Sequence, residues 1–334
     1  MNPARPVMRA VDRFQQRRPV LAFPIAVWKK FGDDQAGSLA ALIAYYAFAS
    51  IFPLLLVLFS VTGIVLAHDP HLQATVHNDA FKDFPILANY FPAHGVKGSG
   101  LGLAIGIILT LLGARGVASA AQNAFNQVWE VPLVRRPGFV PNTLRSLGLL
   151  LAVGVGEIVT IIISGLAGGV GHSFTGAGAY VAATAVALIL NVGLFWLGFR
   201  LATSPEVAGK DLWLGAILSA VAWQILQSFG TYLLRNDVAK STSLYGTFGI
   251  VLGLLAWLYL QFEITLYMVE ASAVRARKLW PRSMFPPPLT AADREAYELY
   301  AKVQQRRAEY EVEVRFAADE EKPAPSRAGR KAKD

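Results

Sequence analysis

A run of 33 residues, from Gln35 to Ala67, contains no charged side chain. From Leu39 onward the run is almost wholly apolar (LAALIAYYAFASIFPLLLVLFSVTGIVLA). As an α-helix these residues would extend about 44 Å, at about 1.5 Å per residue, whereas the hydrocarbon core of a bilayer is about 30 Å thick. A helix of this length and apolarity predicts a membrane span.

The same pattern recurs along the chain and predicts an all-α, polytopic membrane protein. Hydrophobic residues make up 54% of the chain and charged residues 16%, whereas soluble domains carry about 25% charge. Apolar runs of helical length predict six transmembrane helices. They cover residues 39–67, 101–129, 147–170, 177–199, 212–234 and 244–274.

The distribution of Lys and Arg predicts the orientation of these spans. With both termini inside, 27 of these residues lie on the cytoplasmic side and 4 on the outer side. Without the C-terminal segment the ratio is still 13 to 4. Because cytoplasmic loops are enriched in Lys and Arg, we expect a multi-pass protein with both termini in the cytoplasm.

Four regions follow from this pattern. We expect a cytoplasmic N-terminal segment (1–38) with an interfacial helix at 20–30, and a transmembrane domain (39–274). A cytoplasmic helical extension (275–316), helical from 291 after three consecutive prolines, and a disordered tail (317–334) complete the chain. The basic tail serves topology and solubility, or it contacts acidic lipids or a partner.

Carboxylates within the predicted spans are candidates for a substrate or proton pathway, because ionisable groups at membrane depth are costly. They are Glu157 in the third span and Glu263 and Glu270 in the sixth. Each shares a helix face with other polar residues, and the fifth span adds Gln224 and Gln227. Three such faces could line a hydrated cavity.

A second interpretation is that these polar groups only hold the helices together. Glu270 lies close to the cytoplasmic end and could form an ion pair with Arg275 or Arg277. Arg115 is a candidate counter-charge, since the helical pattern continues on both sides of it.

Pro53 lies well inside the first span and should kink it, because it leaves one backbone carbonyl without a donor. Ser50 could satisfy a freed backbone group, and Tyr46 and Pro53 together would shape the cavity. Glycines in the third and sixth spans allow close helix approach or act as hinges.

The sequence offers little for metal or cofactor chemistry. It has no cysteine, so disulfides and thiolate ligands are excluded. Its five histidines fall in predicted outer loops at spacings that match no metal motif, although a metal or pH-sensing site there is conceivable. We expect no cofactor, no metal site and no P-loop.

Three segments contain motifs that resemble those of a known family. Asp33-Asp34-Gln35 precedes an Ala-rich helix with a Tyr pair and a Ser-x-x-Pro-Leu motif, here Tyr45, Tyr46, Ser50 and Pro53. The other matching residues are Asn126 and Trp129 after the second span, and Gly246, Trp257, Tyr259 and Glu270 in the sixth. Together these segments resemble the YihY/BrkB family of bacterial inner-membrane proteins.

The resemblance implies a six-span protein of the bacterial plasma membrane, in a family described as permeases of unassigned substrate. An older label, ribonuclease, is disfavoured, because metal-dependent RNA cleavage needs His and Asp ligands on the cytoplasmic side. This chain also departs from the family's Gly-Ala-Glu, having Met268-Val269-Glu270.

Two functions remain open, neither of them enzymatic. The first is a permease or exporter of an amphiphilic or anionic envelope-related compound, coupled to protons through the intramembrane carboxylates. The second is a non-transporting scaffold for envelope assembly or resistance. The expected partners are membrane lipids and a small or lipidic substrate, without nucleic acid.

Overall fold

The computed structural model describes residues 5–65, 100–138, 140–152, 156, 177–236 and 246–316. Within these ranges every regular element is helical. The long helices are α3 (Ala36–Val65), α6 (Gly100–Val128), α8 (Ala177–Ala202), α9 (Trp213–Asn236) and α10 (Gly246–Ala276). The shorter ones are α1 (Arg5–Gln16), α2 (Pro19–Asp33), α11 (Ala291–Val303), and the 3₁₀ turns η1 (Leu133–Arg135) and η2 (Gly209–Leu212).

Among the described residues, four helices are long and apolar enough to cross a membrane. The spans are Ala36–Val57, Leu103–Val128, Ala185–Ala202 and Val251–Ala276, which belong to four of the six predicted segments. The fifth predicted segment is helical as α9. Most of the third lies outside the described residues, although 140–152 is helical. The chain is therefore a helical, multi-pass membrane protein.

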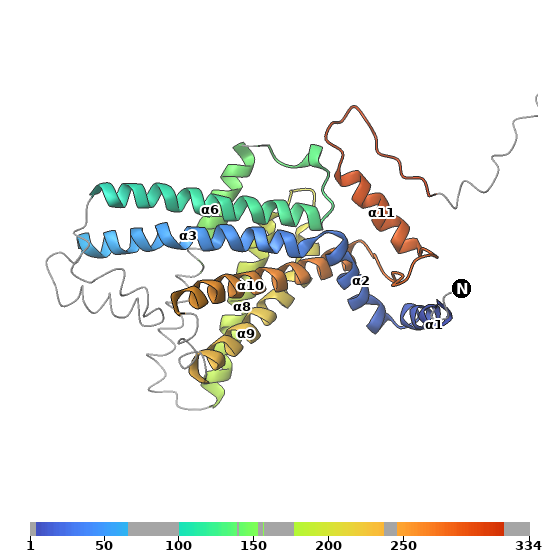
Figure 1. Ribbon diagram of the computed structural model, residues 1–334, viewed down its shortest axis with the longest axis horizontal. Helices are drawn as coiled ribbons and strands as arrows, with labels where there is room; N and C mark the ends of the chain where they lie inside the picture. The colour runs from blue at the N-terminus through green and yellow to red at the C-terminus, as the bar shows by residue number, and fades with distance from the viewer. Residues whose placement is uncertain are drawn as a thin grey trace, which may run out of the picture.

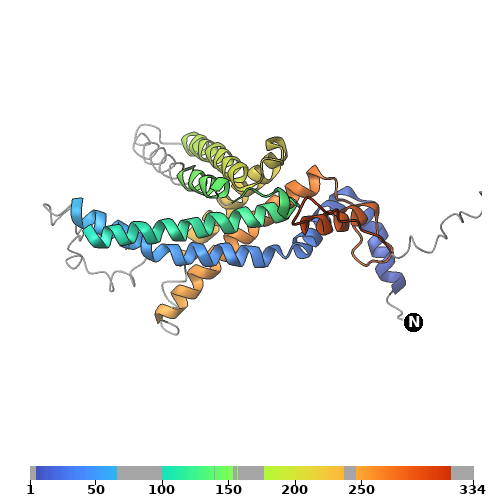
Figure 2. The ribbon, with the colours of Figure 1, turned by 90° about the horizontal axis from the view of Figure 1, so that it is seen from above.

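The long helices form two pairs, and α10 contacts both pairs (Figure 1). Helices α3 and α6 run side by side, α8 packs on α9, and α10 contacts both α3 and α9. Figure 2 shows that the first turns of α10 (orange) leave the α3/α6 pair on the side opposite to α8. The α8/α9 pair diverges from the α3/α6 pair away from the end that carries α2 and α11 (Figure 1). Most of the buried hydrophobic residues, among them Phe31, Phe125, Val128 and Leu266, gather near that end. We call this end of the bundle the base.

Helices α3 and α6 approach closely because glycines of α6 face α3. A Cβ at Gly113 would lie 2.9 Å from the Ser50 Cβ, and one at Gly116 would lie 2.6 Å from the Tyr46 ring. Helix α3 continues through Pro53. The Ser50 hydroxyl donates to the carbonyl of Ala47 (2.8 Å), and not to the carbonyl of residue 49 that Pro53 leaves without a donor.

Helices α9 and α10 meet through a glycine as well. A Cβ at Gly215 would lie 3.0 Å from the Met268 carbonyl oxygen, and the Gly215 N–H donates to the Ser272 hydroxyl (2.6 Å). The resemblance implies small residues before Glu270, where this chain has Met268 and Val269. The close contact is thus made by a small residue on the opposing helix.

The spans expose many apolar side chains on the outer surface of the bundle. Leucine, isoleucine and phenylalanine side chains project outward along all the long helices, as a surface in contact with lipid tails requires. Examples are Ile108, Leu112, Ile189, Ile225 and Phe248.

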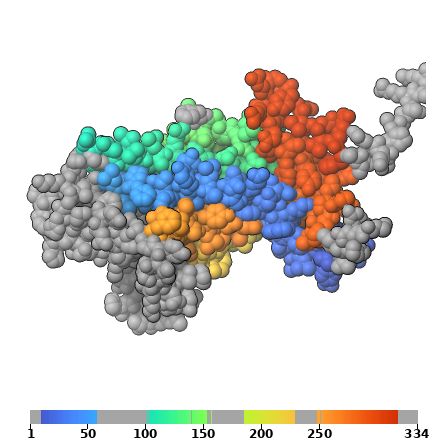
Figure 3. All heavy atoms as spheres, viewed as in Figure 1, coloured from blue at the N-terminus to red at the C-terminus, as the bar shows by residue number. Residues whose placement is uncertain are grey.

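The base is built from both ends of the chain. In the space-filling view the C-terminal segment lies against the N-terminal helices and the end of α6 (Figure 3). The segment 20–30, expected to be an interfacial helix, is helical as part of α2, which extends to Asp33. The helix expected over 291–316 ends already at Val303. Beyond it Tyr310, Val312, Val314 and Phe316 alternate with charged residues, a period of two that gives a helix no apolar face.

Candidate functional site

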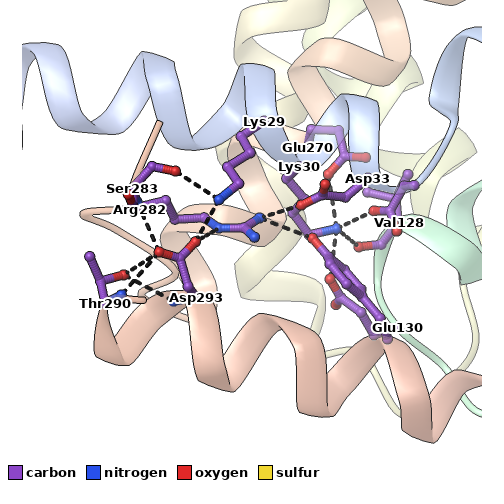
Figure 4. Close-up of polar contacts among 12 residues, drawn as sticks. Lys29, Lys30, Asp33, Val128, Glu130, Glu270, Arg282, Ser283, Thr290 and Asp293 are labelled. Atoms are coloured by element: carbon purple, nitrogen blue, oxygen red, sulfur yellow. Dashed lines mark hydrogen bonds and ion pairs between the residues drawn. The ribbon is translucent and has the colours of Figure 1, made fainter. Parts of the chain in front are cut away.

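A buried lysine of α2 forms the centre of the base. The Lys30 ammonium is fully buried and makes ion pairs with Asp34, Glu130 (2.6 Å) and Glu270 (3.0 Å) (Figure 4). It also donates to the Val128 carbonyl (2.8 Å). One ammonium thus links α2 to the ends of α6 and α10.

Helix ends place the carboxylates around this lysine. Asp34 follows the last residue of α2, and Glu130 follows the end of α6 in a left-handed conformation (φ 46°). The Val128 carbonyl belongs to the last turn of α6, where backbone oxygens lack helical partners and a cation is favourable. Glu130 also pairs with Arg277 (3.0 Å), beyond the end of α10. We call Lys30, Asp34, Glu130, Glu270 and Arg277 the Lys30 cluster.

A second polar cluster is centred on Asp293 in the first turn of α11. Its carboxylate accepts from Lys29 (2.8 Å), the Arg282 Nε (2.9 Å) and the Ser283 backbone N–H (2.9 Å). It also closes a capping box with Thr290, which fixes the start of α11. We call these residues the Asp293 cluster.

Arg282 and Tyr300 join the two clusters. Arg282 is fully buried and pairs with Asp33 (2.9 Å) as well as Asp293, and it donates to the Tyr300 hydroxyl (3.2 Å). The Lys30 ammonium lies 5.8 Å from the centroid of the Tyr300 ring. Helix α11 therefore covers the Lys30 cluster from outside the bundle.

The electrostatics of the base favour charged lysine and charged aspartate. Burial lowers the pKa of Lys30, but the attraction of Glu130, Glu270 and Asp34 outweighs it and holds that pKa well above its usual value. Burial likewise opposes ionisation of Asp293, yet hydrogen bonds from Lys29, Ser283 and Thr290 and from Arg282 lower its pKa to about 2.

The Lys30 cluster contains one more carboxylate than it has cations. Asp34, Glu130 and Glu270 face Lys30 and Arg277, and the three carboxylates have 1% or less of their side chains exposed. Burial raises the pKa of Glu130, and Lys30 and Arg277 offset only part of that effect. This arrangement favours retention of a proton by one of the carboxyl groups. Within the described ranges no group of three metal-binding side chains is placed to hold a metal ion.

The structure brings one predicted carboxylate into the base and leaves another on its own. Glu270 lies in the Lys30 cluster, paired with Lys30 where Arg275 or Arg277 was expected. Glu263 lies two turns deeper on α10, about 10 Å along the helix, is half-buried, and shares a hydrogen bond with Tyr259. Glu157 lies outside the described residues, as do the five histidines.

The remaining predicted pathway residues lie elsewhere in the bundle. Gln224 is half-buried and Gln227 exposed on α9, and Arg115 is half-buried on α6. Tyr46 packs its ring on Gly116. None of these, nor Pro53, belongs to the two clusters.

Some residues of the resemblance lie near the base, and others lie further along the spans. The Asn126 side chain accepts from the Ser204 backbone N–H (2.9 Å), and Trp129 is buried. The Tyr259 hydroxyl lies over Gly37, 3.4 Å from where a Cβ would stand. Tyr45 is exposed, Gly246 begins α10, and Ser50 and Trp257 are half-buried in α3 and α10.

Sequence reasoning missed the centre of the base. Lys30 was assigned to an interface, and Asp34, Glu130, Arg282 and Asp293 had no predicted role. A signal is present, since Asp34 belongs to one motif of the resemblance and Glu130 directly follows Trp129 of another. It does not identify the site, because charges beside apolar helices are usually interfacial.

The comparison with protein families agrees with the resemblance. The family described as Virulence factor BrkB matches residues 27–287, most of the chain. The chain belongs to the BrkB family. The matched range contains the whole Lys30 cluster but ends before α11, so Asp293 lies beyond it.

Relatives of this BrkB-family protein are membrane proteins by name. It is 27% identical over 288 residues to Inner membrane protein YhjD of Escherichia coli K12, covering 80% of this chain and 85% of YhjD. It is 26% identical to UPF0761 membrane protein RSc1559 of Ralstonia nicotianae, covering 84% of this chain and 63% of that protein. The match to UPF0761 membrane protein Smlt0865 of Stenotrophomonas maltophilia is 25% identical and covers 83% and 66%. The chain thus spans slightly less than two thirds of these UPF0761 relatives. No solved structure matches it.

Proposed function

We propose that this chain is a permease or exporter of the bacterial inner membrane, with six spans and both termini in the cytoplasm. The excess of Lys and Arg on one side supports this orientation, and the name of the YhjD relative supports the membrane. Single cysteines in this cysteine-free chain test the topology. Labels that cross only the outer membrane should modify 66–100, and not residues of α1 or α11.

The position of Glu263 is the observation that supports a transport function. Glu263 lies near the middle of the Val251–Ala276 span and is half-buried, with Tyr259 hydrogen-bonded to it. A carboxylate at this depth is costly unless it faces water, a substrate or a partner. Unlike Glu270, it lies away from Lys30, and so its charge is not needed to hold the base together.

The arrangement of the helices supports the same function. The α3/α6 and α8/α9 pairs diverge from the base (Figure 1), and two polar clusters with α11 over them close the bundle at that end. We infer that the base is the cytoplasmic seal of a pathway that passes Glu263. The substrate is an amphiphilic or anionic envelope-related compound, its movement is coupled to protons, and the chain is not an enzyme and binds no nucleic acid.

Ligand-dependent thermal unfolding of the purified chain tests this proposal. Envelope lipids and their precursors form the panel, and a ligand at 100 times its Kd should add about 2.7 kcal/mol of apparent stability. The stabilisation should disappear in Glu263→Gln and persist in Glu313→Gln, whose side chain is exposed outside the bundle. Full stabilisation of Glu263→Gln by every hit would remove Glu263 from the pathway.

A scaffold is the second candidate, favoured by the extent of the ordered base outside the spans. Truncation after Pro288 cannot test it, because that change removes Asp293 and Tyr300 and would unfold the base. Truncation after Phe316 removes only 317–334. Loss of the cellular phenotype in this variant, with Glu263→Gln fully active, would favour the scaffold.

A further inference from the structure

The first N-terminal helix, α1, buries polar side chains and exposes apolar ones, the reverse of a helix in a water-soluble protein. On α1, Asp12 faces inward and accepts from the Ser283 hydroxyl (2.7 Å) and the Met284 N–H (2.8 Å). Gln15 is also buried and donates to the Arg282 carbonyl (2.8 Å). The outward side chains of this helix include Val11 and Phe14, each more than half exposed. A helix with this exposed apolar surface is suited to contact with a membrane or with another protein.

Helix α2 continues this apolar surface. Val20 is 83% exposed and Trp28 62%, with Leu21 also exposed between them. At about 100° per residue these side chains share one face, within roughly a third of the circumference. Ala22 and Ala26 are buried on the other side. The exposed face includes a tryptophan, which is enriched at membrane–water interfaces.

Exposed arginines stand where the two helices join. Arg13, Arg17 and Arg18 are exposed, and the Arg18 guanidinium lies 5.7 Å from the centroid of the Phe14 ring. The acidic residue of this stretch, Asp12, is buried and hydrogen-bonded. The surface is therefore apolar and positively charged, the composition of helices that lie on anionic membranes.

The position of this surface identifies the membrane as its occupant. Only Asp34 and Gln35 separate α2 from α3, whose membrane span begins at Ala36. A second copy of the chain is a poorer fit in a two-fold symmetric contact. Such a contact would set one group of arginines against the same group of the other copy.

We propose that the α1–α2 elbow (Ala10–Trp28) is an anchor that binds anionic phospholipids of the cytoplasmic leaflet. Val20, Leu21 and Trp28 contact the acyl boundary, and Arg13, Arg17 and Arg18 bind the phosphate headgroups. This inference does not rest on transport and would hold equally for a scaffold.

Quenching of Trp28 by brominated lipids tests the anchor. The full chain is placed in nanodiscs of phosphatidylcholine alone or with an equal amount of phosphatidylglycerol, and one lipid is brominated at a time. The signal is the difference between the wild type and Trp28→Phe. We expect brominated phosphatidylglycerol to quench Trp28 more strongly than brominated phosphatidylcholine does at the same mole fraction.

Two matched triple variants separate headgroup binding from general charge. Arg13→Gln/Arg17→Gln/Arg18→Gln should abolish the preference and weaken apparent binding of phosphatidylglycerol roughly a hundredfold. Arg306→Gln/Arg307→Gln/Arg315→Gln removes the same charge from exposed positions beyond α11 and should change neither. High salt should reduce the preference in the wild type.

Three results would overturn the proposal. The first is quenching that is equal for the two lipids and unchanged by the elbow variant. The second is absence of Trp28 quenching by either lipid. The third is a Val20→Cys variant that forms disulfide-linked dimers in native membranes, which would make the elbow an interface between copies of the chain.

Discussion

The ammonium of Lys30 lies 3.0 Å from the carboxylate of Glu270, and both side chains are completely buried. The two residues come from opposite ends of the chain, one before the first span and one near the end of the last. Their contact closes the bundle at the base and brings α2 against α10. Because Asp34 and Glu130 also bind this ammonium, removal of Lys30 would leave three carboxylates without their shared cation.

Lys30→Met should therefore be among the most destabilising single substitutions in the chain. Breaking a buried ion pair by removing one partner costs about 3–5 kcal/mol. Thermal unfolding in detergent measures this loss, with Lys302→Met, at an exposed position of α11, as the control. A wild-type unfolding temperature for Lys30→Met would show that the cluster does not hold the base together.

Glu270→Ala and Glu263→Gln should separate stability from transport. Glu270→Ala removes a buried side chain and its contact with Lys30, and should lower the unfolding temperature. Glu263→Gln should unfold like the wild type but lose the response to ligand. Both measurements are made on the same preparations. If the Glu270 variant lost the response to ligand and Glu263→Gln lost stability instead, the pathway would lie at Glu270.

Asp293→Asn should change the acid stability of the protein. The folded pKa of Asp293 is about 2 against an ordinary value of 3.8. The stability that its charge contributes is therefore complete above about pH 4 and is lost as the pH falls toward 2. At neutral pH the substitution should lower the free energy of unfolding by about 2 kcal/mol at most, because solvent partly screens the charge. Unfolding curves between pH 2 and pH 6 should show a smaller pH dependence in Asp293→Asn, and an unchanged profile would contradict the assignment.

Gly215→Ala tests the close contact of α9 with α10. The added Cβ would lie 3.0 Å from a backbone oxygen, which cannot move aside as a flexible side chain can. We expect a loss of about 1–3 kcal/mol, the usual cost of overpacking. Gly253→Ala is the matched control, because nothing lies within 4 Å of its Cβ and alanine favours the helix. Equal unfolding temperatures for the two variants would argue against a tight α9–α10 contact.

Much of the fold follows from local sequence. The predominantly apolar runs 39–67 and 244–274 predict two helices, which the structure places at Ala36–Val65 and Gly246–Ala276. Apolar runs of this length have few alternatives to a helix, because a backbone in lipid must satisfy its own hydrogen bonds. The helix expected over 291–316 was too long, because the alternation of apolar and charged residues over 310–316 gives a helix no apolar face.

The candidate site was only partly predictable. Glu263 and Glu270 could be selected because a carboxylate inside an apolar run is rare. Lys30, Glu130 and Asp293 could not, because each stands beside a helix end, where a solvated charge and a buried one have the same sequence context.

The sequence by itself thus determined that this chain is helical and membrane-embedded, and it placed carboxylates at depth. The tertiary structure alone decided which charges are buried together. Hydrophobicity acts on each helix separately, so a local run of residues records it. An ion pair such as Lys30 with Glu270 depends on where separate helix ends meet, and no local run records that.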